Sequence, residues 1–562
     1  MHPPSIAPPL LAGRLSAVGA VLLLALPLVW GWHPTPTLGT LAEAVAVFCV
    51  AALLAISPSP TAVDWRRLGL GSAGLLGLLL LRCLGQALGG DSAYAGFWFG
   101  PLAVLGTAFL VSVYWQQSAA DGLKVVAAAV LLAATINALV GLLQYWRLAV
   151  VFDFLGPYLV YWDRTDNVAH GNVAQRNILA SLCLLGLAAS VYLFPRRRAP
   201  VIAVEGFLAY VVALSASRTP LVIVLAMVLL TLFRGRHWRA LAQPTVRWFV
   251  VPVLLAQLLA PVVNQALFAL LEMTPVEASV ERLSAHGLGI RPIYYQIAAE
   301  IGWQSGGIWG LGWKSLPVAM VAQGYRQNLW GASELPTHAH NVLLQLWVEN
   351  GPLIALLASL YPIWLLFRRG FPSSRQDYAR LSLLVLIVHS WLEYPLWQPA
   401  LLFLFVVLMG TLESDDPTPD QAARQTAPPS RFRGGLGLRA LAVAVAMGAG
   451  VTVLQFVAVA AIWKQISSQP AELADTGLNS LRLNPVIEPY ADWLALNMNI
   501  DTAAQRVLRL ERLAQWLPDA MMLELLADAY RAAGRLNDAQ KIDSQRRVVF
   551  GVASGPQDEV NN

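Results

Sequence analysis

Apolar residues run along most of the chain in long stretches, which short polar segments separate. Many of these stretches are close to the roughly 20 residues that a helix needs to cross a bilayer. The pattern therefore predicts an all-α, polytopic membrane bundle of about 13 transmembrane helices. We expect the spans at about 10–30, 39–57, 68–89, 95–114, 124–146, 178–194, 200–216, 219–233, 247–271, 342–367, 381–396, 398–412 and 440–463.

The pattern also divides the chain into four parts. An N-terminal bundle (1–271) precedes a long polar loop (272–341), and a second bundle (342–463) follows. The second bundle contains a linker, 413–439, whose many Asp, Pro, Gln and Arg residues predict disorder. Residues 464–562 lack an apolar run long enough to span and show helical periodicity instead, which predicts a soluble α-helical domain.

One segment of this last domain has a repeat-like pattern. Residues 525–534, followed by Leu536 and Ala539, are similar to the helix–turn–helix of a tetratricopeptide unit. Such a unit needs neighbours to bury its apolar face, and 471–483 and 501–517 are candidate partner helices. We expect a TPR-like domain, which serves either as a small helical cap or as a platform for a protein acceptor.

Composition agrees with a membrane protein, and charge gives its orientation. The chain is 57% hydrophobic and 13% charged, against roughly 25% charged in ordinary globular proteins. Residues 10–30 are long enough to span and no small-residue cleavage pattern follows, so we expect them to be the first span. Clustered Arg and Lys mark the cytoplasmic side, which predicts a cytoplasmic N-terminus and an outer C-terminal domain. The clusters are at 14, 66–67, 124, 196–198, 234–247, 368–380 and 424–439.

The same count of spans places four polar segments on the outer side of the membrane. They are 147–177, 217–218, 272–341 and 393–397. Each contains polar residues that are hard to explain as packing, and all four approach the membrane from one face. We expect the functional site where they meet.

Five motifs in these segments resemble a known family. The chain is similar to the bacterial O-oligosaccharyltransferases, the protein glycosylation ligases related to O-antigen ligases and Wzy-type polymerases. The likeness covers about residues 100 to 412, and the chain departs from the family pattern at Arg176, where proline is frequent. The motifs are Gly171-Asn172 with Gln175 and Asn177, Ser217-Arg218-Thr219, Gly310-Leu-Gly-Trp313, His340-Asn341 with Leu344 and Gln345, and His389-Ser390 with Glu393-Tyr394-Pro395.

The resemblance implies transfer of a preassembled oligosaccharide from undecaprenyl pyrophosphate to an acceptor in the periplasm. It implies the bacterial inner membrane as location, a periplasmic active site and C-terminus, and Ser or Thr hydroxyls of a pilin-like protein as acceptors. Membrane lipid is a further expected partner, and nucleic acid is not one. Lipid A-core, as in O-antigen ligases, and another glycan chain, as in polymerases, remain alternative acceptors.

The chemistry of such a transfer assigns roles to three residues. A hydroxyl is a weak nucleophile unless a base takes its proton, and histidine has the side-chain pKa closest to neutral. His340 fits this role. Arginine stays charged and binds phosphate oxygens in a fork, so Arg218 and Arg291 are the candidates for binding the pyrophosphate. We expect no metal and no cofactor.

Each of these residues also has a simpler interpretation. His338 and His340 have the spacing of a zinc-binding pair, and the arginines are also suited to anchoring at the membrane edge. The expected supporting residues are Gln175, Asn177, His338, Asn341 and Tyr394. Gln175 and Asn177 are also compatible with helix caps or loop hydrogen bonds, Tyr394 with an interfacial aromatic belt, and His338 with a structural role.

A lipid-linked glycan flippase or transporter is the alternative from a different class. It also needs many spans, together with charges or broken helices near the membrane midplane. The strongest candidates in this chain lie at one face, and Arg82 and Asn137 are the main polar exceptions within predicted spans.

Overall fold

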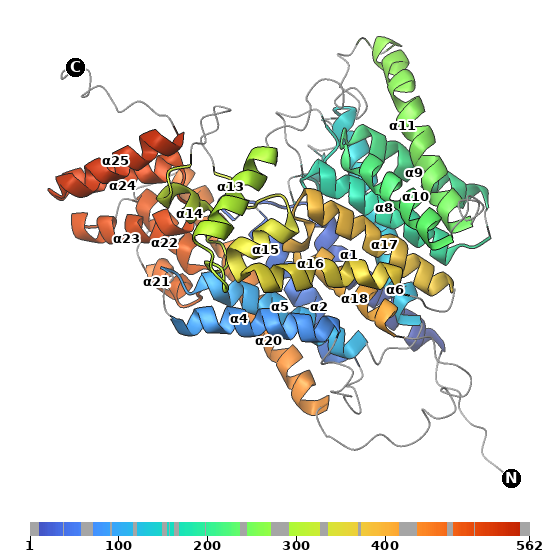
Figure 1. Cartoon of the computed structure of the whole chain (residues 1–562), viewed down its shortest axis with the longest axis horizontal. Helices are drawn as coiled ribbons and strands as arrows, with labels where there is room; N and C mark the ends of the chain where they lie inside the picture. The colour runs from blue at the N-terminus through green and yellow to red at the C-terminus, as the bar shows by residue number, and fades with distance from the viewer. Residues whose placement is uncertain are drawn as a thin grey trace.

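A computed structural model gives the arrangement of the chain (Figure 1). It describes residues 10–37, 39–57, 71–89, 93–115, 121–148, 154–156, 158–161, 168–196, 198–235, 244–270, 272, 291–325, 335–368, 373–414, 435–468, 476–498 and 501–550. The regular structure of these residues is helical and includes no strand, in agreement with the predicted all-α class.

Eleven helices of the described residues lie before His340. They are α1 (Leu10–Val29), α2 (Thr40–Ile56), α4 (Ser72–Gly89), α5 (Gly96–Trp115), α6 (Asp121–Tyr145), α8 (Arg176–Leu193), α9 (Ala199–Leu214), α10 (Thr219–Gly235), α11 (Pro244–Leu270), α13 (Arg291–Gln304) and α14 (Leu316–Ala322). Ten α-helices follow: α15 (Val342–Asn350), α16 (Pro352–Phe367), α17 (Ser374–Leu392), α18 (Pro399–Glu413), α20 (Gly435–Ser468), α21 (Thr476–Arg482), α22 (Glu488–Met498), α23 (Ala503–Trp516), α24 (Ala520–Ala532) and α25 (Leu536–Phe550).

Every predicted span coincides with helical structure. Six helices of the described chain, α4, α5, α6, α8, α11 and α20, are long and apolar enough to cross a membrane. Six shorter apolar helices lie within α1, α2, α9, α10, α16 and α18. The chain is therefore a helical membrane protein, and the count of thirteen spans stays a prediction.

One predicted span is not a continuous helix, so this prediction is wrong. The stretch 342–367 is two helices, α15 and α16, separated at Gly351, whose φ is +85°. Pro352 follows and cannot continue the hydrogen-bond ladder of α15. The loop before α14 packs into the break, where the N–H groups of Leu311 and Gly312 donate to the carbonyls of Val348 and Glu349 at 2.7 and 2.9 Å. This loop contains the Gly310–Trp313 motif, so the motif caps the end of α15.

Two other boundaries differ from the predictions. Helix α17 begins at Ser374, where the Ser373 side chain caps the first turn, and it ends at Leu392, before the predicted 396. Helix α20 begins at Gly435, inside the predicted linker 413–439. Linker residues 415–434 lie outside the described residues, as do Arg282, His286 and Arg326 of the predicted outer loop.

Helix α8 lies at the centre of the main core. Fourteen of its residues are buried, and it packs against α6, α9 and α17. Gly186 permits this packing, because a Cβ atom there would lie 2.5 Å from the Cβ of Ala134 in α6. Small residues at such contacts let membrane helices approach closely. The N-terminus of α8 is therefore held firmly by the bundle.

Arg82 and Asn137, the main polar exceptions within the predicted spans, have structural partners. Arg82 Nε donates to the carbonyl of Trp309 at 2.9 Å, which ties α4 to the loop before α14. Asn137 Nδ2 donates to the carbonyl of Leu28 at 2.7 Å, and its Oδ1 accepts from the N–H of Val173 at 3.1 Å. Both side chains thus satisfy backbone groups where helices meet loops.

The helices after α20 gather at one end of the molecule, beside α13 and α14 (Figure 1). Helices α24 and α25 form a hairpin that turns at Gly534, where φ is +75°. This hairpin lies where the sequence predicts a helix–turn–helix, at 525–539. That it is a tetratricopeptide repeat stays a prediction. The boundaries of the four predicted domains also stay predictions. Phe550 and Leu523 of the hairpin pack in one cluster with Val321 of α14 and Leu335. The C-terminal helices therefore contact the segment that leads to His340.

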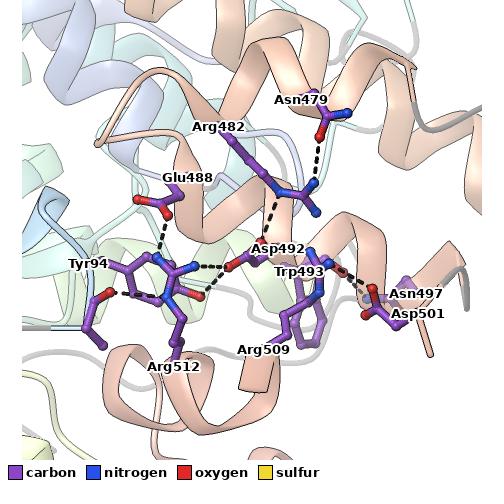
Figure 2. A network of polar contacts seen from close by, with 11 residues as sticks. Tyr94, Asn479, Arg482, Glu488, Asp492, Trp493, Asn497, Asp501, Arg509 and Arg512 are labelled. Atoms are coloured by element: carbon purple, nitrogen blue, oxygen red, sulfur yellow. Dashed lines mark hydrogen bonds and ion pairs between the residues drawn. The ribbon is translucent and has the colours of Figure 1, made fainter. Parts of the chain in front are cut away.

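A buried carboxylate connects these helices to the membrane bundle (Figure 2). Asp492 is 3% exposed and accepts from the hydroxyl of Tyr94, just before α5, at 2.9 Å. Its oxygens also contact Arg482, Arg509 and Arg512 at 3.2, 2.8 and 3.1 Å. The Arg512 guanidinium lies over the Tyr94 ring, 4.2 Å from its centroid. This network fixes α21–α23 against the loop between α4 and α5.

Candidate functional site

The structure brings the four predicted outer segments together around one pocket of about 420 Å³. Residues from 147–177, 217–218, 272–341 and 393–397 all line it. Its walls consist of His170, Ala174, Gln175, Arg176, Asn177, Arg218, Arg291, Tyr294, His340 and Glu393. The three residues to which the sequence assigned chemistry, His340, Arg218 and Arg291, thus share one pocket.

Four helices begin at this pocket. Helix α8 starts at Arg176, α10 directly after Arg218, α13 at Arg291, and α15 two residues after His340. The first turn of a helix has N–H groups without intrahelical partners and a partial positive charge, which together favour anions. The pocket is therefore surrounded by positive helix ends as well as by arginine side chains.

Two of the predicted supporting residues are caps of these helices. The Gln175 side chain accepts from the N–H of Ile178 at 2.7 Å, at the start of α8. Asn341 accepts from the N–H of Leu344 at 3.1 Å, at the start of α15, and donates to the carbonyl of Trp391 at 3.0 Å. The capping interpretation of Gln175 is thus confirmed, and Asn341 is a cap that was not predicted from the sequence. Both caps fix helix ends that carry the pocket.

His340 has an unusual backbone conformation directly before its helix. Its φ is +53°, in the left-handed region that few residues other than glycine adopt. Strained backbone of this kind is typical of functional sites. Tyr295 donates to the His340 carbonyl at 3.1 Å, and the His340 ring lies beside the Tyr294 ring at 5.8 Å between centroids. These contacts hold the imidazole at the pocket wall.

Glu393 connects the polar residues of the pocket. It is 3% exposed, and its Oε2 lies 2.5 Å from His340 Nδ1, while Oε1 forms an ion pair with Arg291. Asn177 Nδ2 also donates to Oε1 at 2.7 Å, and Ser217 Oγ donates to Asn177 Oδ1 at 2.6 Å. A continuous chain of hydrogen bonds therefore runs from Ser217 to His340.

The environment of Glu393 keeps it ionised. Burial by itself raises the pKa of a carboxyl, but the hydrogen bond with His340 and the charges of Arg291 and His340 lower the pKa of Glu393 below its ordinary value. No role was predicted for Glu393, although it belongs to one of the family motifs. Its signal was a single acidic residue in an outer turn without Lys or Arg.

His338 and Tyr394 lie behind His340 and are not among the residues that line the pocket. Their rings stack with centroids 4.3 Å apart and an interplanar angle of 11°, and His338 Nδ1 lies 2.8 Å from the hydroxyl of Thr337. Burial, with a smaller contribution from His340, lowers the pKa of His338 to about 3, so its ring is neutral at neutral pH. A neutral, stacked ring suits support of the neighbouring residue.

Residues of the types that bind metals do not gather in the described part of the chain. No group of three or more His, Cys, Asp or Glu residues there could hold a metal ion. In the candidate pair, His340 Nδ1 contacts Glu393 and His338 Nδ1 contacts the hydroxyl of Thr337.

Four further residues on the pocket wall had no role predicted from the sequence. These are His170, Ala174, Arg176 and Tyr294. Arg176 lies within the Gly171–Asn177 motif and His170 directly precedes it, but a motif does not reveal which of these side chains point into a cavity. Their position depends on how α8 packs, which only the structure provides.

Three family models match the chain. Residues 169–194 match a model described as protein glycosylation ligase, residues 203–360 match O-antigen ligase, and residues 378–560 match the C-terminal part of a membrane-bound polymerase described as a virulence factor. No curated protein matches the chain. The matched regions together cover more than half of the sequence and include every residue that lines the pocket. With its apolar helices, the chain is therefore a multi-pass membrane protein that belongs to the superfamily of O-antigen ligases and protein glycosylation ligases.

Proposed function

We propose that this protein transfers a preassembled oligosaccharide from undecaprenyl pyrophosphate to Ser or Thr hydroxyls of periplasmic proteins such as a pilin. The observation that carries the proposal is a histidine bound to a carboxylate in a pocket lined by arginines. The histidine is suited to take a proton from a hydroxyl, and the arginines are suited to hold a departing pyrophosphate. The match to the protein glycosylation ligase model favours a protein as acceptor.

His340 acts as the general base in this proposal. Because Glu393 is ionised and can only accept, the hydrogen bond at 2.5 Å places the proton on Nδ1 of His340. When the ring is neutral, Nε2 carries the lone pair. A carboxylate that holds one ring nitrogen in this way orients the imidazole and stabilises the cation that forms when it takes a proton.

Arg218 and Arg291 bind the pyrophosphate and stabilise the charge that develops as it leaves. Arg291 uses Nη2 for its contact with Glu393, and a guanidinium has five N–H donors, so further donors remain for phosphate oxygens. The N-termini of α8, α10, α13 and α15 add positive potential at the same place. Groups fixed before the reaction need no reorganisation when negative charge appears.

The reaction is a single displacement. The acceptor oxygen forms a bond to the anomeric carbon as its proton moves to Nε2 of His340. The bond from that carbon to the pyrophosphate oxygen breaks, and its electron pair leaves with undecaprenyl pyrophosphate. Configuration at the sugar carbon inverts, because Glu393, the one carboxylate among the described lining residues, is engaged by His340 and Arg291.

Ligation to lipid A-core is the second candidate. The match of residues 203–360 to the O-antigen ligase model favours it, and the same chemistry serves when the acceptor hydroxyl belongs to a sugar. The two candidates differ in the acceptor alone, so the acceptor is what the experiment must identify.

The test is co-expression with a lipid-linked glycan locus and a pilin, in a host that lacks its own ligase. Intact-protein mass measurement of the pilin and electrophoresis of the lipopolysaccharide are made on the same cells, with the His340→Ala variant as control. A glycan-sized mass increase on the pilin supports the proposal. Modified lipopolysaccharide with unmodified pilin would contradict the proposal and support O-antigen ligation instead. If neither the pilin nor the lipopolysaccharide is modified, glycan transfer itself is overturned.

A further inference from the structure

We propose that Arg176 is a third guanidinium that binds the pyrophosphate of the lipid-linked donor. This inference deepens the proposed function and rests on it. Arg176 lines the same pocket as Arg218, Arg291 and His340, although no role was predicted for it from the sequence. Its position in the fold and the charges of the pocket both support the assignment.

The position of Arg176 is fixed relative to the reacting groups. It is the first residue of α8, between the cap residue Gln175 and Asn177. Asn177 donates to Glu393 at 2.7 Å and accepts from Ser217 at 2.6 Å. Because both neighbours of Arg176 are held by hydrogen bonds, its backbone has a defined place at the pocket wall.

Arg218 is held in a similar way. It directly follows Ser217 in sequence and directly precedes α10, so the hydrogen bond from Ser217 to Asn177 joins the backbone segments that carry the two arginines. Arg291 is joined to the same group through Glu393. The three arginines therefore occupy the starts of three helices that one buried hydrogen-bonded network holds together.

The charges of the pocket favour three arginines over two. Glu393 is an ionised carboxylate that contacts Arg291. A pyrophosphate that carries a lipid on one end and a sugar on the other has two negative charges. With the two lining histidines uncharged, the formal charges of Arg176, Arg218, Arg291 and Glu393 add to +2 on the lining, which matches such a diester. Without Arg176 the lining would have one positive charge fewer than the diester has negative charges.

This assignment predicts selectivity for pyrophosphate over monophosphate lipids. A third guanidinium can reach the second phosphate group, and a hydrogen bond to a charged group contributes more than one between neutral groups. Loss of Arg176 should therefore weaken binding of the pyrophosphate lipid more than binding of the monophosphate lipid.

The experiment measures binding of undecaprenyl pyrophosphate and of undecaprenyl phosphate to the full-length protein in lipid nanodiscs. We expect Arg176→Gln to weaken binding of the pyrophosphate lipid by about tenfold, with a smaller effect on the monophosphate lipid. Arg176→Lys should lose less affinity for the pyrophosphate lipid than Arg176→Gln, because lysine keeps the positive charge but lacks the planar guanidinium. Arg198→Gln is the matched control, because Arg198 is an exposed arginine that precedes α9 and is not among the lining residues.

Equal affinities for the pyrophosphate lipid in wild type, Arg176→Gln and Arg198→Gln would overturn the inference. If Arg176→Gln does not fold, binding is measured with Arg176→Lys in its place. Wild-type selectivity for the pyrophosphate lipid in Arg176→Lys would then overturn the role assigned to the planar guanidinium. The measurement does not depend on transfer, so a wild-type protein that binds the lipid selectively but modifies no acceptor would refute the proposed function alone.

Discussion

Glu393 is the residue on which the other polar residues of the pocket depend. It contacts His340, Arg291 and Asn177 at the same time, so it orients the proposed base and holds one of the proposed phosphate-binding residues. Such a carboxylate acts through its neighbours and is a positioning residue.

The Glu393→Gln variant should lose transfer by about 10²-fold or more. The amide keeps the size of the side chain but removes the charge that orients His340 and stabilises its protonated form. We expect the loss in kcat, with a smaller change in the KM for the acceptor. The measurement is steady-state transfer with purified enzyme, lipid-linked donor and acceptor.

Glu413→Gln is the matched control for this variant. Glu413 also accepts hydrogen bonds, from Ser72 and Tyr361, and is not among the residues that line the pocket. Its variant should keep transfer per folded enzyme. Equal activity of Glu393→Gln and wild type would remove Glu393 from the mechanism.

Functional residues with a distinctive chemical type were predictable from the sequence. Those whose role depends on their position in the fold were not. His340, Arg218 and Arg291 stood out because a base and phosphate-binding cations have few alternatives among side chains. Glu393, Arg176 and their neighbours acquire a role only because α8 and α17 bring them to the same pocket. The type of a side chain is encoded locally, whereas its neighbours are set by packing.

At the scale of elements, helices were predictable and their interruptions were not. Long apolar runs specify helices in a membrane because every backbone group needs an internal partner. The run 342–367 gave no sign of a break apart from Gly351-Pro352. The break is stabilised by the Gly310–Trp313 loop, a contact between segments that periodicity cannot reveal.

Gly351→Ala should therefore prevent correct folding of this region. A Cβ atom there would overlap the carbonyl oxygen of Ile308, and the φ of +85° is strained for alanine. We expect little monodisperse protein in size-exclusion chromatography of the detergent-extracted variant. The control is Gly448→Ala in α20, where a Cβ atom meets nothing within 4 Å. Wild-type behaviour of Gly351→Ala would contradict the observed break between α15 and α16.

At the scale of the whole molecule, the C-terminal helices are attached to the bundle and also to the segment that leads to the pocket. Asp492 connects them to Tyr94 (Figure 2). Leu335, a few residues before His340, packs in one cluster with Phe550, Leu523 and Val321. The sequence predicted a separate helical domain, but only the structure shows these contacts.

Asp492→Ala should destabilise this attachment by about 3 kcal/mol or more, because it leaves three buried or half-buried arginines without their shared carboxylate. Limited proteolysis should release the C-terminal helices faster than in wild type. Asp528→Ala is the control, since the Asp528–Arg531 pair is exposed and such pairs contribute little. Equal proteolysis of both variants and wild type would show that the network does not hold the domain.

The central claim, that His340 takes the acceptor proton, is tested most directly by transfer in the His340→Ala variant. The assay uses purified membranes with lipid-linked donor and acceptor, normalised to enzyme amount, with and without chelator. We expect transfer to be lost while the protein inserts normally and still binds the donor, whose pyrophosphate is assigned to the arginines. His338→Ala should be milder, and a chelator should have no effect on wild type. Full transfer by His340→Ala would contradict the account.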